Sequence, residues 1–288
     1  MLFLIGIGAL GGIALVLTTL LVWANKKLHV EEDRRIDVID EVLPQSNCGA
    51  CGYPGCRAFA EALVDNKSPP GSCTVSSPEV IGRIADYLGV DAGEQEKRVA
   101  RLACAGGTNV ARHSAHYDGL DSCRAAAQVA GGGKSCFWGC LGFGDCETVC
   151  DFDAIEMNAH SLPIVSEDLC TACGDCVVVC PKDLFSLHPI SHRLWVPCKN
   201  LEIGDQLLDH CSVVCTACGR CALDAPNGLI TMQNNLPVID YTRDHNTKVP
   251  IERCPTGAII WLEADGNIVT GVKTKRTIRQ GSLEDLPT

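Results

Sequence analysis

Twenty cysteines stand out among the 288 residues of this sequence, and many of them recur at short, regular spacings. The most specific group consists of Cys170, Cys173, Cys176 and Cys180, followed by Pro181. This is the C-x2-C-x2-C-x3-C-P spacing of bacterial iron–sulfur proteins, in which three cysteines hold one cluster and the fourth holds its neighbour. The run therefore predicts two [4Fe-4S] clusters that exchange a ligand.

A looser run precedes it and would supply the neighbouring cluster. Its members are Cys136, Cys140, Cys146 and Cys150. Exchange of the last cysteine of each run predicts two ligand sets. They are Cys136, Cys140, Cys146 and Cys180 for one cluster, and Cys150, Cys170, Cys173 and Cys176 for the other. Structural zinc is bound by paired cysteines or histidines, so a zinc site has no use for three cysteines at this spacing.

A glycine-rich knot nearer the N-terminus carries another four cysteines. They are Cys48, Cys51, Cys56 and Cys73. The intervening glycines let the backbone wrap tightly and turn its N–H groups toward the sulfurs of a cluster. Four thiolates fit either zinc or one [4Fe-4S] cluster, and the spacing favours the cluster.

The segment from Gly228 to Pro255 is an eroded copy of the segment from Asp153 to Pro181. Each begins with five residues that end in Met (Asp-Ala-Ile-Glu-Met and Gly-Leu-Ile-Thr-Met), continues with Leu-Pro and two branched residues, and ends with Cys-Pro. The lost ligand positions of the copy carry Ala225, Asp244, Thr247 and Pro250. All four ligands of one cluster are thus missing together, as ligand exchange predicts. One predicted cluster set is kept: Cys215, Cys218, Cys221 and Cys254.

Four cysteines fall outside these sets. They are Cys104, Cys123, Cys198 and Cys211. Buried cysteine packs like a small apolar residue, so free thiols are one interpretation. A fifth cluster is the other, because 20 cysteines make five sets of four. Cys211 could also replace Cys215 as a ligand.

Composition excludes several classes of protein. The net charge of −11 argues against a nucleic-acid partner. Only 5% of residues are aromatic, so we expect small cores that bound metal helps to stabilise. A disulfide scaffold is usually much shorter than this chain. Dinucleotide, haem and catalytic-triad motifs are missing, so we expect no self-contained active site, and any enzymatic activity would belong to a complex.

The N-terminal segment is predicted to anchor the chain in a membrane. Residues 2–24 carry no charge and are numerous enough to cross a hydrocarbon core of about 30 Å as a helix. Lys26, Lys27, Arg34 and Arg35 follow, with no Lys or Arg before them. The positive-inside rule then predicts a single pass through the cell (inner) membrane, with the cysteine-rich part in the cytoplasm. A cleaved signal peptide is the alternative, but its basic leading region is missing.

We therefore predict an α+β chain with an N-terminal transmembrane helix, a small four-cysteine Fe-S domain and two bacterial-ferredoxin-like modules. Helices are expected over residues 29–43 and 78–88, and the glycines at 131–133 are expected to form a flexible joint. The expected bounds are 1–25 for the anchor, 26–90 for the four-cysteine domain, 91–130 for a linker or mixed segment, 131–190 for a two-cluster module, 191–264 for a degenerate module and 265–288 for a tail.

The order of anchor, knot and modules resembles the B subunit of the Rnf complex, an ion-translocating ferredoxin:NAD⁺ oxidoreductase. The most specific part is Cys48-Gly-Ala-Cys51-Gly-Tyr-Pro-Gly-Cys56 followed by Cys73, and the likeness extends to about residue 262. The stretch from Cys136 to Cys150 resembles the longer members from anaerobes. The resemblance implies soluble reduced ferredoxin as electron donor and the other membrane subunits as partners and acceptors. The eroded module departs from the family pattern, because Asp244, Thr247 and Pro250 replace expected ligands.

Two other functions remain open on the sequence. One is a polyferredoxin subunit of another membrane redox complex, such as a hydrogenase. The other, of a different class, is a zinc-stabilised scaffold protein. The anchor followed by the knot favours the Rnf-type function, with one-electron hopping along four or five [4Fe-4S] clusters as the mechanism.

Overall fold

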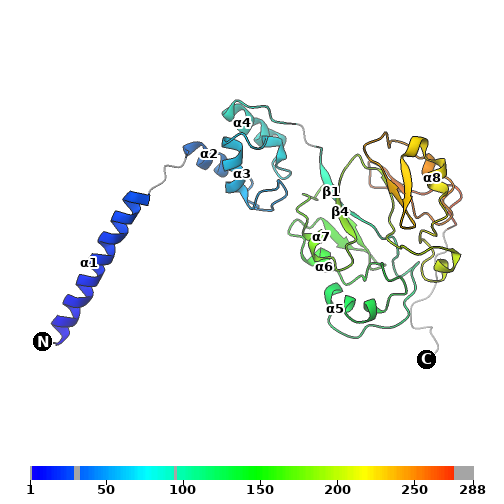
Figure 1. Cartoon of the computed structure of the whole chain (residues 1–288), viewed down its shortest axis with the longest axis horizontal. Coiled ribbons are helices and arrows are strands. Elements are labelled where there is room, and N and C mark those ends of the chain that lie inside the picture. Colours follow the sequence, from blue (N-terminus) through cyan, green and yellow to red (C-terminus); the bar gives the residue numbers. More distant parts are fainter. Residues whose placement is uncertain (1, 29–32, 94–95, 276–288) are drawn as a thin grey trace.

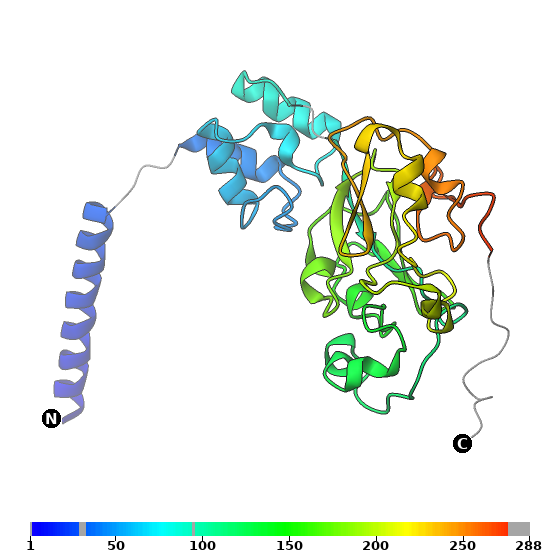
Figure 2. The same ribbon diagram turned by 45° about the vertical axis from the view of Figure 1, so that its right-hand side comes forward.

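The computed structural model describes residues 2–28, 33–93 and 96–275. Three parts follow one another along the chain: a long N-terminal helix, a small helical domain and a larger cysteine-rich body of short strands and helices (Figures 1 and 2). Short elements predominate in the body because glycine-rich loops around the cysteines occupy most of its length.

The N-terminal helix α1 (Leu2–Leu28) extends three residues beyond the predicted end of the anchor. Its last turn contains Lys26 and Lys27, which are good helix formers and therefore do not end it. Within the described residues, one helix is long and apolar enough to cross a membrane, over Gly6–Lys27. The apolar side chains of this helix are not buried against the rest of the chain, so they require another apolar environment.

The helical domain contains α2 (Arg34–Val42), α3 (Cys56–Val64), the short 3-10 helix η1 (Pro70–Ser72) and α4 (Pro78–Leu88). The helix predicted over 78–88 is confirmed: Ser77 caps its start and Gly89, at φ 66°, ends it. Helix α2 begins later than expected because Asp33 caps it, accepting a hydrogen bond from Arg35 N; residues 29–32 lie outside the described residues. The apolar core consists of residues such as Ile39, Phe59, Leu63 and Ile84.

The body is built on antiparallel strand pairs. Strand β1 (Arg98–Leu102) pairs with β4 (Phe185–Pro189), β2 (Ile155–Met157) with β3 (Pro163–Val165), and β6 (Ile230–Gln233) with β7 (Leu236–Ile239); β8 (Ile260–Leu262) lies between β5 (Leu194–Trp195) and β9 (Ile268–Val269). The helices are α5 (Cys123–Ala127), α6 (Asp145–Thr148), α7 (Asp175–Val179) and α8 (Arg220–Asp224), with 3-10 turns η2 (Ala130–Gly133), η3 (Asp205–Asp209), η4 (Pro226–Gly228) and η5 (Val249–Ile251).

The observed strand pairing crosses two of the segment boundaries that were expected from the sequence. Strand β1 lies inside the segment expected to be a linker, yet it pairs with β4 over its whole length, from Arg98 opposite Pro189 to Leu102 opposite Phe185. Its buried Val99 explains this, since a strand with an apolar face belongs to a core. The expected tail begins at 265, but β9 pairs with β8 there, so the sheet continues past residue 264. Residues 276–288 lie outside the described residues.

The sequence repeat is also a structural repeat. Hairpin β2–β3 and hairpin β6–β7 have corresponding registers, with Ile155 opposite Val165 and Ile230 opposite Ile239. After the second hairpin, the buried Pro250 and Ile251 lie where the first copy has its cysteine run. Ile251 joins an apolar core cluster, so the eroded lobe is filled by packing.

Candidate iron–sulfur centres

All twenty cysteines are free thiols, and most of them surround hollows in the body. Four hollows have nearly equal empty volumes, about 340, 350, 330 and 330 Å³, and four cysteines line each of them. The remaining four cysteines lie in the helical domain. We number the resulting five sets site 1 to site 5, in the order in which they lie next to one another.

Site 1 is the knot of the helical domain, and it groups the expected residues. They are Cys48, Cys51, Cys56 and Cys73. Asn47 accepts a hydrogen bond from Cys56 N at 2.8 Å, which fixes the entry into α3. Ser76 Oγ lies 3.1 Å from the Cys73 sulfur and donates to it. Gly49, at φ 72°, begins a tight turn in which Gly52 N donates to Gly49 O.

Site 2 also groups the expected residues. They are Cys150, Cys170, Cys173 and Cys176. Backbone N–H groups of Ala100 and Ala154 donate to two of these sulfurs, Cys170 and Cys150, each at 3.4 Å. Such N–H···S bonds stabilise negative charge on a sulfur.

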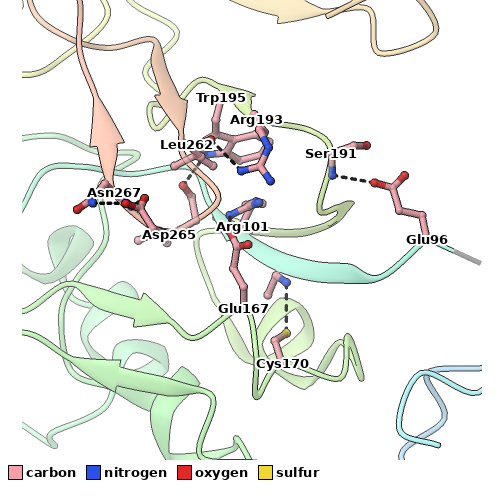
Figure 3. Close-up of polar contacts among 12 residues, drawn as sticks. Glu96, Arg101, Glu167, Cys170, Ser191, Arg193, Trp195, Leu262, Asp265 and Asn267 are labelled. Carbon is pink, nitrogen blue, oxygen red and sulfur yellow. Dashed lines mark hydrogen bonds and ion pairs between the residues drawn. The ribbon is translucent and has the colours of Figure 1, made fainter. Parts of the chain in front are cut away.

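A buried ion pair fixes the strand that passes site 2. Figure 3 shows Arg101 of β1 beside Glu167, while a backbone nitrogen of the same strand points at the Cys170 sulfur. Two guanidinium nitrogens of Arg101 are buried and find no hydrogen-bond partner among the described residues.

Site 3 differs from the predicted set by one residue. Its members are Cys123, Cys140, Cys146 and Cys180, so Cys123 takes the place expected for Cys136. The cause is Asp145, whose carboxylate accepts hydrogen bonds from Cys123 N at 2.9 Å and Arg124 N at 3.1 Å. The carboxylate thereby caps α5 and holds its first residue against the adjacent Cys146.

Site 4 contains the displaced cysteine together with three of the four that the repeats left over. Its members are Cys104, Cys136, Cys198 and Cys211. The preceding turn directs Cys136 toward this site. In this turn Ser135 N donates to Arg112 O, and the backbones of His113 and Lys134 form an isolated antiparallel β-bridge. The predicted leftover set had Cys123 in this position.

Site 5 groups the expected residues of the second copy. They are Cys215, Cys218, Cys221 and Cys254. Cys215 and Cys254 are buried in the apolar core cluster of this copy, whereas Cys218 is the one cysteine of the twenty that is exposed.

One glycine-based turn recurs at three of these sites. Gly144, Gly174 and Gly219 each precede a short helix with φ of 79°, 95° and 71°. Each places a cysteine at the second residue of that helix: Cys146, Cys176 and Cys221. Only glycine adopts this left-handed conformation at little cost, so the G-x-C pattern fixes the direction of the cysteine side chain.

The donor geometry fits a cluster better than a single ion. Within the described ranges, no three His, Cys, Asp or Glu side chains lie close enough together to hold one metal ion. The thiols of each hollow instead face a shared space, whereas zinc requires four sulfurs at about 2.3 Å from one point. Burial raises the pKa of the thiols of Cys140, Cys146 and Cys176 to about 12. Since iron binds thiolates, cluster assembly must release protons here.

Hydrogen bonds join neighbouring sites. Thr74, next to Cys73 of site 1, donates through Oγ1 to the carbonyl of Thr171 at 2.7 Å. Thr171 lies between Cys170 and Cys173 of site 2. Cys140 N of site 3 donates to the Cys104 sulfur of site 4, and Cys215 N of site 5 donates to the Cys198 sulfur of site 4, both at 3.4 Å. Sites 2 and 3 are interleaved by the exchange of Cys150 and Cys180.

The fold and these sites define a class: an iron–sulfur electron carrier that follows an apolar N-terminal helix. Two family models match parts of the chain. One, described as "Putative Fe-S cluster", matches residues 43–75, and the other, a 4Fe-4S binding domain, matches residues 162–185. The protein therefore carries [4Fe-4S] clusters.

Curated relatives narrow the class. The chain is 38% identical to the B subunit of the Na⁺-translocating ferredoxin:NAD⁺ oxidoreductase complex of Acetobacterium woodii, over 89% of this chain and 77% of the relative. It is 38% identical to the B subunit of the proton-translocating complex of Clostridium ljungdahlii, over 86% of this chain and 88% of the relative. It is 33% identical to the B subunit of the ion-translocating oxidoreductase complex of Methanosarcina acetivorans, over 88% of this chain and 96% of the relative. The chain belongs to the family of Rnf complex B subunits.

Proposed function

We propose that this chain is the electron-transfer subunit of an Rnf-type ion-translocating ferredoxin:NAD⁺ oxidoreductase. It accepts electrons from reduced soluble ferredoxin and passes them to other membrane subunits. The observation that carries this proposal is the unbroken succession of four-cysteine sites, each tied to the next by a hydrogen bond or an exchanged ligand. The names of the three relatives support the choice of complex.

Each of sites 1, 2, 3 and 5 holds one [4Fe-4S] cluster through its four cysteine thiolates. The clusters supply reversible one-electron chemistry at potentials that hydrogen bonds and charge adjust. The polypeptide contributes N–H donors to the ligand sulfurs, as at Ala100 and Ala154. These donors favour the reduced state, because an added electron increases the negative charge that they stabilise.

The two ends of the series suit different partners. Site 1 follows the apolar helix α1 closely in sequence, so it is the site from which electrons leave toward the membrane subunits. Site 5 has the exposed Cys218, which lets a soluble donor approach its cluster. Helix α1 holds the chain in the cell membrane, and Lys26 and Lys27 at its end support a cytoplasmic position for the body.

The proposed function is tested in membrane vesicles from a strain that lacks this chain and a strain that carries it again on a plasmid. Ferredoxin-dependent NAD⁺ reduction should fall at least about tenfold without the chain and return with it. Hydrogen-dependent ferredoxin reduction is the matched control, and it should stay the same. Loss of the hydrogen-dependent reaction alone would instead assign the chain to a hydrogenase.

A further inference from the structure

Site 4 is not explained by either of the repeated modules. Its cysteines come from four separate segments, which are the loops that follow β1, η2, β5 and η3. Backbone hydrogen bonds bring these segments together, from Ala105 N to Pro197 O at 3.0 Å, from Arg112 N to His210 O at 2.8 Å and from Ser212 N to Val110 O at 2.9 Å. The site therefore lies where the two-site module meets the second copy.

We infer that Cys104, Cys136, Cys198 and Cys211 hold a fifth [4Fe-4S] cluster, which connects the two modules electrically. This inference rests on the proposed function, because it extends the same series of clusters. The hollow of site 4 is lined by four cysteine side chains, as are those of sites 2, 3 and 5. The same four donors around a comparable hollow can hold the same group.

The backbone around site 4 leaves room for sulfur and directs donors at it. A Cβ atom at Gly106 would lie 3.3 Å from the Cys211 sulfur and 3.6 Å from the Cys104 sulfur, so the backbone here packs directly against two of the four sulfurs. The Cys104 sulfur accepts hydrogen bonds from Gly106 N and Cys140 N, both at 3.4 Å. Thiols that served only as packing groups would need neither donor, because a neutral thiol is a weak acceptor.

A buried lysine adds a second, independent argument. Lys134 lines the hollow and is only 8% exposed. Its ammonium donates to two carbonyl oxygens, those of Gly106 and Cys140, and it forms no ion pair with a carboxylate in the part of the chain that the structure describes. A buried cation without a counter-charge is costly. A cluster with four thiolate ligands is anionic and would supply that charge.

The position of site 4 gives it a function in the series. A ligand of site 3, Cys140, and a ligand of site 5, Cys215, each donate a backbone N–H to a site 4 sulfur. Site 4 is thus adjacent to both, and electrons pass from site 5 through site 4 to site 3. The second copy lost one cluster, and site 4 restores the connection that this loss would interrupt.

The test counts iron and acid-labile sulfide in the full chain, purified anaerobically in detergent, with Mössbauer spectra of ⁵⁷Fe-labelled protein. The unaltered chain should hold about 20 iron atoms, and Cys198→Ala should lose about four. The double variant Cys136→Ala/Cys198→Ala should lose no more than that, because both residues serve one cluster. The matched double variant Cys123→Ala/Cys198→Ala should lose about eight, because its two residues serve different clusters.

Three results would overturn the inference. About 16 iron atoms in the unaltered chain would leave site 4 without a cluster, and this result needs no variant to fold. Unchanged iron in Cys198→Ala would do the same. The third result is a loss of about eight iron atoms in Cys136→Ala/Cys198→Ala together with a loss of about four in Cys123→Ala/Cys198→Ala. It would support the grouping expected from cysteine spacing, in which Cys123 and Cys198 belong to one site. Reduction of the purified chain by ferredoxin is measured separately. The number of clusters and the identity of the electron donor are therefore tested independently.

Discussion

At the scale of single residues, a group of aromatic rings joins β4 to the second copy. His192 stacks on Tyr241 with ring centres 3.7 Å apart, and His188 Nδ1 lies 3.2 Å from His192 Nδ1. His245 meets both rings of the stack edge-on, and Tyr241 OH donates to Leu194 O at 2.7 Å. This ring group is defined by His188, His192, Tyr241 and His245. Because burial lowers the pKa of His188 and His192, the contact between the modules depends on the neutral imidazoles of these two residues.

Stability should therefore fall in mild acid. Burial, then His192 and the nearby arginines, lower the pKa of His188 from 6.5 to about 4. Between these values the unfolded chain binds the proton and the folded chain does not, so the stability present above pH 6.5 is lost as the pH falls toward 4. Thermal unfolding of His188→Gln should show a smaller decrease in Tm between about pH 7.5 and about pH 5.5 than the unaltered chain.

The control for this measurement is His116→Gln, which changes an exposed histidine outside the ring group. Iron content has to be equal in the compared samples, because cluster loss would also lower Tm. An equal decrease in Tm for His188→Gln and the unaltered chain would contradict the account.

Cysteine spacing predicts some of these sites and not others, for a physical reason. Where ligands lie within a few residues on one turn, as at Cys170, Cys173 and Cys176, the local backbone sets the site. Cys123 and Cys136 are different, because each is placed by partners far along the chain. Asp145 holds Cys123 from 22 residues away. The hydrogen bonds of the Asp145 carboxylate place Cys123 in site 3, and cysteine spacing alone cannot predict them.

At the scale of elements, the glycine run at 131–133 is a packed turn. It was expected to be a flexible joint, but all three glycines have positive φ, and Gly132 and Gly133 are buried. The carbonyl of Gly133 accepts hydrogen bonds from Ser114 N and Ala115 N. Glycine is used here for its conformation and small size. The turn therefore orients Lys134 and Cys136 toward site 4.

Gly133→Ala should destabilise the body and deplete site 4. A Cβ at this residue would collide with the carbonyl oxygen of Ala115, in addition to the roughly 1 kcal/mol cost of a left-handed alanine. The matched control is Gly266→Ala, where φ is also positive, at 80°, but nothing lies within 4 Å of the added atom. Chemical unfolding and iron counts compare the two variants. Equal losses of stability in the two variants would contradict the prediction that the close contact with the Ala115 carbonyl destabilises Gly133→Ala.

The elements themselves were predicted unevenly. Helix α4 (Pro78–Leu88) has its cap, its apolar spacing and its terminal glycine within one short segment, so local physics determines both ends. Strand β1 has no such signals, because a short strand becomes visible only through its pairing with β4, which lies far along the chain. Strand β1 therefore lies outside the range 131–190 expected for the two-cluster module, although it pairs with a strand inside that range.

At the scale of the whole molecule, the sites form a series whose order differs from the order of the cysteines. Site 1 meets site 2 through Thr74 and Thr171, and site 3 meets site 4 through Cys140 and Cys104. Segments far apart in sequence thus supply neighbouring sites, which makes the body fold around its metal. Removal of iron by a chelator should therefore unfold the body, as a loss of far-UV circular dichroism would show, since binding free energy at such sites is folding free energy.

The most direct test of an electron-carrying series is the content of iron, acid-labile sulfide and zinc per chain after anaerobic purification. Twenty cysteines in five sets predict about 20 iron and about 20 sulfide with negligible zinc. Zinc without sulfide would contradict the account and would make the chain a zinc-stabilised scaffold.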